Sequence, residues 1–358
     1  MSRARLRDLG VVIGRFPTGA HNALTDVPGV RVGHATLIED RPHVARTGVT
    51  VIVPCDGEVH RHAPFAGYHA FNGYGEMTGL LWVEESGLLT SPIAMTNTNQ
   101  VGLVSETLVA VGAQRFGGGA YALPVVGETY DGWLNQIDAF PLRREHVLEA
   151  LDAAADGPVA EGNVGGGTGM ICHDFKGGIG TASRRFETAG GTFVVGALVQ
   201  ANHGDRALLR VDGVPVGQAL GPEHTPLPWS APESEGSILI VLATDAPLLP
   251  VQCKRLARRA TIGLARTGGI GHNGSGDLFL AFASGNRVPD KAPAAIPLRM
   301  LPHRALNPLF EAAAEAVEEA ILNALTAAET MTGQRGRVVQ AVPLEALQEL
   351  MQRWRPPA

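Results

Sequence analysis

The sequence is poor in cysteine and in aromatic residues, and it has no long apolar run. Its cysteines are odd in number, lie far apart and form no C-x-x-C pair, so we expect neither a disulfide framework nor a structural zinc site; they are Cys55, Cys172 and Cys253. Aromatic residues make up 5% of the chain, which disfavours stacking platforms for single-stranded nucleic acid. Since there is no 18-residue apolar window and no signal-peptide-like segment, we expect a cytoplasmic protein without a membrane span.

Three common motifs are also missing. The chain lacks the Gly-Lys-Ser/Thr ending of a P-loop, the H-E-x-x-H pair of a metallopeptidase and the G-x-S-x-G elbow of a serine hydrolase. Its formal net charge of −6 disfavours a nucleic-acid-binding protein. The sequence therefore predicts no metal site, no cofactor and no nucleic-acid partner.

What the chain does contain is apolar material and glycine. Apolar residues make up 45% of its 358 residues and charged residues 18%, which excludes a disordered chain. Runs rich in valine and isoleucine predict strands over residues 30–37, 49–53, 93–96, 192–199, 237–244 and 278–283. Apolar periodicity predicts helices over residues 251–266, 309–325 and 344–353.

The glycine-rich run over residues 162–169 invites comparison with loops that bind phosphate through backbone N–H groups. A dinucleotide-binding loop leads into a helix, but the following residues, 170–180, are too rich in glycine to form one. We interpret the run as tight turns at which backbone segments pass closely.

Residues 221–236 contain four prolines and no periodicity, which is typical of an exposed loop. The loop ends at Gly236-Ser237, where an apolar run begins. If the bond between these residues were cut, Ser237 would carry both a hydroxyl nucleophile and a free α-amine. That amine, with an ordinary pKa of about 7.7–8.0, could serve as the general base for the hydroxyl. The alternative is that Ser237 is simply the serine that opens a strand.

A second polar group lies at residues 273–277, at the start of another apolar run. Ser275 and Asp277 are two residues apart, so both side chains would lie on one face of a strand. A serine hydroxyl can relay a proton, and a carboxylate can hold an ammonium group. The alternative is an Asn-Gly hairpin with a capped turn.

Two more apolar runs end in polar residues. Asn202 ends one of them, and its amide N–H₂ group could stabilise an oxyanion. Glu128 and Tyr130 follow the other and add a carboxylate and a hydroxyl group to the candidate site residues.

These segments together make the chain resemble the DmpA-like family of L-aminopeptidase/D-esterase and β-peptidyl aminopeptidase enzymes. Six stretches carry the resemblance in the same order as in the family, and they extend over nearly the whole chain: residues 22–34, 71–79, 128–131, 162–183, 236–237 and 273–277.

The resemblance implies a fold and a maturation step. The fold is a four-layer αββα sandwich, similar to that of N-terminal-nucleophile hydrolases but with different connectivity, and we expect one domain over residues 1–358. The precursor cuts itself between Gly236 and Ser237 into an α chain of residues 1–236 and a β chain of residues 237–358. The active form is expected to be a homo-oligomer of αβ units, typically of four.

The resemblance also implies roles for the candidate residues. Ser237 corresponds to the nucleophile, with its own amine as the base. Ser275 and Asp277 correspond to the supporting serine and acid, and β-peptide-cleaving relatives often have glutamate at the second of these positions. Asn202 corresponds to the asparagine of the oxyanion hole, and Tyr130 to a tyrosine near the developing charge.

The predicted function is a self-processing serine aminopeptidase or amidase that releases N-terminal residues from short peptides, amides or esters through an acyl-enzyme on Ser237. Glu128 and Asp277 are the candidates for holding the free amine of the substrate. One alternative is an acyltransferase of related fold, which is disfavoured because ornithine acetyltransferases use threonine as nucleophile. The other is an uncut, non-catalytic relative that binds ligands.

Overall fold

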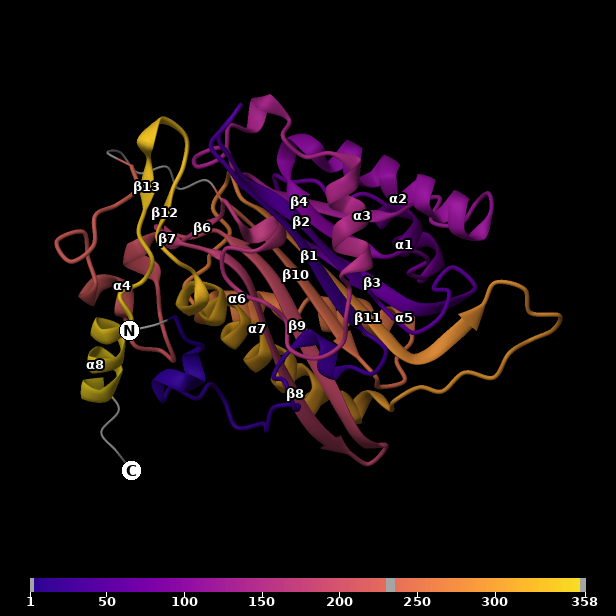
Figure 1. Ribbon diagram of the computed structural model, residues 1–358. Coiled ribbons are helices and arrows are strands. Elements are labelled where there is room, and N and C mark those ends of the chain that lie inside the picture. Colours follow the sequence, from indigo (N-terminus) through magenta and orange to yellow (C-terminus); the bar gives the residue numbers. More distant parts are fainter. Residues whose placement is uncertain (1–2, 230–235, 355–358) are drawn as a thin grey trace.

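The computed structural model describes residues 3–229 and 236–354 (Figure 1). Two β-sheets form its centre. The first sheet has the strand order β1 (Arg31–Glu39), β2 (Ala45–Val53), β4 (Ile93–Asn97), β5 (Val125–Thr129). The second has the order β3 (His62–Gly73), β11 (Gly276–Pro289), β10 (Ser237–Thr244), β9 (Gly191–Asn202), β8 (Gly178–Thr188).

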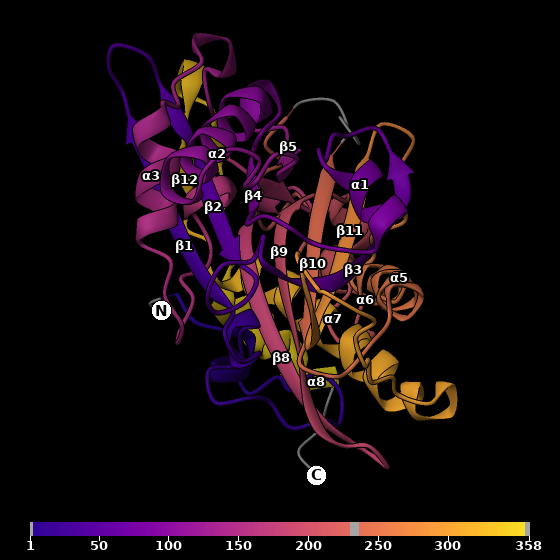
Figure 2. The same cartoon turned by 90° about the vertical axis from the view of Figure 1, so that its right-hand side faces the viewer.

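Helices cover the outer face of each sheet, so that four layers follow one another across the molecule (Figure 2). The first sheet is covered by α2 (Val101–Phe116) and α3 (Arg144–Asp152), and the second by α5 (Pro250–Ala257), α6 (Ala260–Arg266) and α7 (Asn307–Ala327). This arrangement confirms the predicted αββα sandwich.

Smaller elements lie around the sandwich. They are the helices α1 (Leu80–Ser86), α4 (Val216–Ala219) and α8 (Leu344–Trp354), and the two-residue strands β6 (Ile171–Cys172), β7 (Phe175–Lys176), β12 (Met331–Thr332) and β13 (Val338–Val339). Single turns of 3-10 helix occur at Leu6–Leu9, Leu24–Asp26, Thr98–Gln100, Ile137–Ala139, Gly165–Gly167, Arg206–Leu208, His303–Leu306 and Gln334–Gly336. No helix within the described ranges is both long and apolar enough to cross a membrane.

The alternation of apolar side chains along β10 explains how the layers are held together. One face of this strand packs into the core under the helices, and the other face packs into the core between the sheets; the two sets are Ile238, Ile240, Leu242 and Leu239, Val241, Ala243. Because every residue of the strand is buried, β10 fits only in a layer that is covered on both sides.

The sequence-based predictions of strands and helices are confirmed with one exception. The predicted strands correspond to β1, β2, β4, β9, β10 and β11, and β10 has the predicted limits. The single helix over residues 251–266 is wrong, because α5 and α6 are separated at Arg258 and Arg259. In α5, the backbone N of Lys254 packs against Gly67 of β3, whereas Gly263 of α6 packs against α7. The two halves therefore face different neighbours.

The glycine-rich run confirms the predicted close approach of backbone segments. A Cβ atom on Gly167 would lie 2.6 Å from the carbonyl carbon of Gly178. Residues 170–180 form no helix; they form the β6–β7 hairpin and the start of β8. Of the proline-rich segment, residues 230–235 lie outside the described residues, and Pro222, Glu223 and His224 are exposed.

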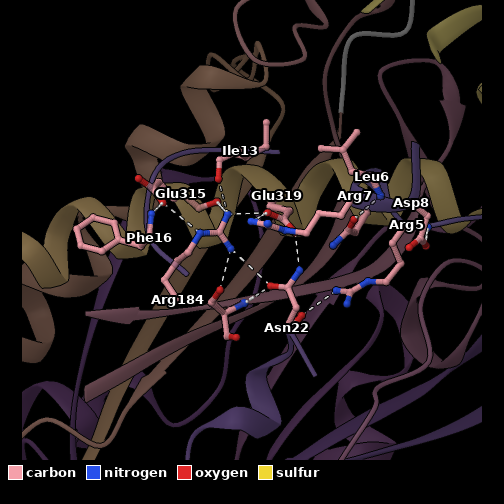
Figure 3. A network of polar contacts seen from close by, with 12 residues as sticks. Arg5, Leu6, Arg7, Asp8, Ile13, Phe16, Asn22, Arg184, Glu315 and Glu319 are labelled. Atoms are coloured by element: carbon pink, nitrogen blue, oxygen red, sulfur yellow. Dashed lines mark hydrogen bonds and ion pairs between the residues drawn. The ribbon is translucent and has the colours of Figure 1, made fainter. Parts of the chain in front are cut away.

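A buried polar network joins the N-terminal segment and β8 to α7 (Figure 3). Arg184 of β8 donates to Glu315 (3.1 Å) and Glu319 (2.6 Å) of α7 and to the carbonyl oxygen of Ile13 (3.0 Å). Arg7 donates to both carboxylate oxygens of Glu319, at 2.8 and 2.9 Å. The network therefore links three segments that lie far apart in the sequence.

Candidate active site

Three neighbouring strands of the second sheet begin or end at one place, beside the polar candidate residues. β9 ends at Asn202, β10 begins at Ser237, and β11 begins at Gly276. The register places Ser237 opposite both Asn202 and Gly276. Ser237 is 7% exposed. Strand pairing therefore brings together three segments that the sequence singled out separately.

The hydroxyl of Ser237 shares a hydrogen-bond donor with the carbonyl group that precedes it. The backbone N–H of Gly276 donates to Ser237 Oγ (3.1 Å) and to the carbonyl oxygen of Gly236 (3.3 Å). Gly236 has no room for a side chain, because a Cβ atom there would lie 2.8 Å from the Cα of His203. A Cβ atom on Gly276 would lie 2.7 Å from the Cα of Gly75. The glycines thus permit this close approach of backbone segments.

Ser275 and Asp277 form the predicted pair. Ser275 Oγ donates to Asp277 Oδ1 at 2.7 Å, and both residues are buried. Burial raises the pKa of Asp277 to about 6, and the hydrogen bond from Ser275 acts against this shift. Asp277 Oδ2 has no hydrogen-bond partner in the part of the chain that the structure describes. Such a carboxyl group can exchange a proton near neutral pH or bind an ammonium group.

The segment before this pair corrects one of the alternatives. The backbone N of Ser275 donates to the carbonyl of His272 at 2.9 Å and closes a turn at Asn273 and Gly274. The turn is present, but the Asn-Gly hairpin is wrong. β11 pairs with β10 along one edge and with β3 along the other, so it does not form a hairpin across the Asn273-Gly274 turn.

Asn202 is held in one orientation. Its Oδ1 accepts a hydrogen bond from the backbone N of Ile171 (2.8 Å), and its Nδ2 donates to the carbonyl of Tyr130 (3.1 Å). Tyr130 is 54% exposed, and its ring lies against Gly132, where a Cβ atom would overlap with it. The structure therefore joins Tyr130 to the site through its backbone carbonyl. Since an amide nitrogen carries two N–H groups, Asn202 retains a second donor.

Glu128 lies in the other sheet, at the edge of the site. Its Oε1 accepts from the backbone N of Glu76 (2.9 Å), and its Oε2 accepts from the hydroxyl of Thr98. Burial raises its pKa, while both hydrogen bonds act against the shift. Gly75 lies between Glu128 and Gly276, because a Cβ atom there would lie 3.2 Å from Glu128 Oε1 and 3.1 Å from the Cα of Gly276.

Two members of the site were not predicted. The first is the N–H of Gly276, for which the only signal was a glycine between two polar candidates. The second is His272, whose Nε2 lies 3.5 Å from Asp205 Oδ2 and whose charge would lower the pKa of Asp277. A cavity of about 10 Å³, large enough for one water molecule, is bordered by His203, Gly236, His272, Ser275 and Asp277.

The fold and the serine at the start of a central strand define the class first: a hydrolase with the αββα fold of N-terminal-nucleophile enzymes. The family follows from the sequence. The chain belongs to peptidase family S58, whose model matches residues 22–339. This assignment confirms the DmpA-like resemblance, and the protein is an aminopeptidase.

Similar proteins match over almost the whole chain. The β-peptidyl aminopeptidases BapA of Sphingosinicella microcystinivorans and Sphingosinicella xenopeptidilytica are 45% and 42% identical, over 98% and 97% of this chain and 92% and 90% of their own. A β-aminopeptidase structure from Burkholderia sp. has 52% identity and a TM-score of 0.92 over 99% of this chain and 100% of its own. The L-aminopeptidase D-Ala-esterase/amidase of Ochrobactrum anthropi, described as a new variant of the Ntn hydrolase fold, has 45% identity and a TM-score of 0.90 over 98% of each chain.

Proposed function

We propose that the protein is a self-processing serine aminopeptidase with Ser237 as its nucleophile. One observation carries the proposal: the N–H of Gly276 donates to both Ser237 Oγ and the carbonyl oxygen of Gly236. The attacking hydroxyl and the carbonyl that it would attack thus share one donor. A donor aimed at that carbonyl oxygen stabilises the negative charge that develops on it during attack.

Self-processing would begin in the uncut chain. Ser237 Oγ loses its proton and bonds to the carbonyl carbon of Gly236, the C–N bond to Ser237 breaks, and the departing nitrogen takes up a proton. Water then hydrolyses the resulting ester. The products are a carboxylate on Gly236 and a free α-amine and hydroxyl on Ser237. We propose that the chains 1–236 and 237–358 remain one αββα unit, because β9 and β10 pair across the cut.

The new amine would then serve as the base for substrate hydrolysis. With an ordinary pKa of about 7.7–8.0, it is partly neutral at pH 7 and can accept the hydroxyl proton. Ser237 forms the acyl-enzyme, and the amide of Asn202 and the N–H of Gly276 are the proposed donors to the oxyanion. Ser275 and Asp277 form a hydrogen-bonded proton relay beside them. Tyr130 is proposed to lie near the negative charge that develops on the oxyanion, on the solvent-exposed side of the site.

The proposed substrates are short peptides, amides or esters with a free N-terminal amine. Asp277 is the primary site for that amine because its buried Oδ2 has no hydrogen-bond partner among the described residues, and Glu128 adds negative charge behind Gly75. The names of the relatives define the substrates to compare, namely β-peptides and amides of L-amino acids. Assembly of several αβ units and a cytoplasmic location remain predictions, and light scattering on the purified protein tests the first of them.

The intact mass of the purified protein under denaturing conditions tests self-processing. We expect wild-type protein and Ser284→Ala, a matched serine farther along β11, to give two chains that meet at Gly236/Ser237. Ser237→Ala should remain one 37.5 kDa chain and hydrolyse substrate at less than about 10⁻⁴ of the wild-type rate. A wild-type chain that stays intact, or a Ser237→Ala chain that is still cut, would contradict self-processing.

An acyl donor mixed with an excess of a second amine separates the peptidase from an acyltransferase. A peptidase should release mainly the free amino acid, whereas a transferase should form mainly the new amide. A predominance of transfer product at every amine concentration would overturn the assignment of water as the physiological acceptor.

A further inference from the structure

A second buried cluster lies next to Asn202. Cys172, His173 and His203 each offer one ligand atom, these atoms lie within 4.8 Å of one another, and all three residues are buried. Cys172 Sγ is 3.8 Å from His203 Nδ1, and the two imidazole rings meet edge to face. Within residues 3–229 and 236–354, the buried Nε2 atoms of both histidines have no hydrogen-bond partner. Buried polar atoms without partners are rare and require an explanation.

The turn that carries this cluster has an unusual backbone. His173 and Asp174 have φ values of 49° and 58°, a region that disfavours residues other than glycine. Arg206 holds the turn: its backbone N donates to Asp174 Oδ2 (2.8 Å), and its guanidinium donates to the carbonyls of His173 (3.1 Å) and Asp174 (2.6 Å). A strained conformation that several contacts enforce often marks a functional site.

The ring of His173 is also fixed in orientation. Its Nδ1 lies 2.9 Å from the carbonyl oxygen of Asp205, so Nδ1 carries the proton and Nε2 presents a lone pair. The ring packs on Gly204, where a Cβ atom would lie 2.6 Å from Nδ1. A histidine that donates one N–H to a carbonyl and turns the other nitrogen inward has the usual arrangement of a metal ligand.

We propose that Cys172, His173 and His203 bind a thiophilic divalent cation of the Zn²⁺ type. One thiolate and two imidazoles are a donor set that suits this ion and leaves a fourth position for water. Coordination would replace the S–H bond of Cys172 by a sulfur–metal bond and release the proton to solvent. This site departs from the sequence-based expectation of no metal, because its ligands come from two separate segments that match no metal motif.

The cation would act on the proposed oxyanion donor. His203 directly follows Asn202, and Cys172 directly follows Ile171, whose backbone N holds Asn202 Oδ1 at 2.8 Å. Binding would therefore fix the two backbone segments that orient this amide. This consequence rests on the proposed function, whereas the existence of the site does not.

Metal content of the full-length protein tests the site. Chelator-treated wild-type protein is titrated with Zn²⁺ and then with Co²⁺, and bound metal is measured by mass spectrometry after gel filtration. We expect one equivalent per chain and, with Co²⁺, a thiolate-to-metal absorption band. Ser237→Ala should bind the same amount, which separates this result from the fate of the proposed catalysis.

Variants identify the ligands. Cys172→Ser should weaken binding by more than about 100-fold, since even the loss of a residue that only supports a ligand costs 10–100-fold. Cys253→Ser, which removes another fully buried thiol, should bind like the wild type. If Cys172→Ser does not fold, the presence or absence of the thiolate-to-Co²⁺ absorption band in the wild-type protein decides whether a cysteine binds the metal. A wild type that binds no metal, a Co²⁺ complex without that band, or unchanged binding by Cys172→Ser would overturn the proposal.

Discussion

The network of Figure 3 and the serine site both bury carboxyl groups, but they shift the pKa values of these groups in opposite directions. Glu319 and Asp277 are almost completely buried, and burial by itself raises the pKa of each. At Glu319, hydrogen bonds and positive charge from two arginines outweigh burial, so its pKa lies below the usual value. At Asp277 the hydrogen bond from Ser275 does not outweigh the effect of burial, so the pKa of Asp277 rises to about 6.

The difference lies in the partners and not in the depth of burial. Each oxygen of Glu319 accepts from an arginine, whereas Asp277 Oδ2 has no partner within the described ranges. Complete pairing keeps a carboxylate charged and makes it part of the framework. Incomplete pairing leaves a carboxyl group that can take up a proton or a ligand. Open hydrogen-bonding capacity, rather than burial, therefore distinguishes a candidate site from a structural network.

The largest expected effect comes from removing a cation of the network. Arg184→Met leaves Glu315 and Glu319 with buried, poorly compensated charge, and should lower the free energy of unfolding by about 3–5 kcal/mol. Urea unfolding followed by circular dichroism measures this loss. Arg185→Met removes the neighbouring, exposed arginine and should change stability little. Equal effects of the two substitutions would show that the network is not structural.

The next effect concerns catalysis without a comparable loss of stability. Asn202→Ala should lower kcat by about 10²–10³, the usual cost of one oxyanion donor. Steady-state kinetics on fully processed protein give the value. Asn286→Ala, which removes another buried asparagine of the same sheet, should leave kcat unchanged. A loss of less than tenfold in Asn202→Ala would remove this residue from the oxyanion site.

The two carboxyl groups should respond to pH with opposite signs. The raised pKa of Asp277 means that its stabilising contribution is present below pH 4 and is lost as pH rises through about 6. Asp277→Asn should therefore gain about 1–3 kcal/mol relative to wild type between pH 4 and pH 8. For Glu319 the pKa is lowered, so its contribution is present above pH 4.5 and is lost as pH falls below this value.

Unfolding free energies measured across this pH range test both signs. Glu319→Gln should be less stable than wild type at pH 7, and the deficit should shrink under acid conditions. In the same Asp277→Asn protein, activity should still fall as the amine of Ser237 is protonated below about pH 8, but the further fall near pH 6 that we expect for wild type should be absent. Parallel pH dependence of the two variants would contradict the contrast between the regions.

The smallest effect is expected at Tyr130. Tyr130→Phe removes the hydroxyl of an exposed tyrosine but keeps the carbonyl that accepts from Asn202. Since one hydrogen bond contributes about 0.5–1.5 kcal/mol, kcat should fall only about 2–10-fold. Measuring kcat for this variant and for Asn202→Ala under the same conditions shows whether the Tyr130 hydroxyl or the Asn202 amide contributes more to catalysis. A hundredfold loss would show that the hydroxyl contacts the reacting oxygen directly.

Most of the strands that the sequence predicted are largely buried, although β1, at the edge of its sheet, also carries exposed residues. β10 is an uninterrupted apolar run, so its limits follow from composition alone. β8 was not predicted, because its segment begins with glycines and buries Ser183 and Arg184. Those residues are acceptable in the interior only because Asp26, Asn22 and α7 supply their partners. Such compensation depends on tertiary contacts that no local pattern records.

The site was predictable in parts. The two-residue spacing of Ser275 and Asp277 correctly placed both side chains together, although Ser275 lies just before the start of β11 at Gly276. The neighbourhood of Asn202 and Ser237 depends on the register between β9 and β10, and only the family resemblance anticipated it. Backbone donors such as the N–H of Gly276 have no side-chain signature, so their roles emerge only from the fold.

The position of β10 between β9 and β11 has a consequence for the proposed two-chain form. While the chain is continuous, the loop keeps β9 and β10 at a high effective concentration, and the sheet forms by a unimolecular reaction. After the cut, separated chains would have to meet by diffusion, so recovery of activity should slow as the protein is diluted. The peptide bond between Gly236 and Ser237 would thus be needed only while the sheet assembles. After the cut, strand pairing would keep the two chains together.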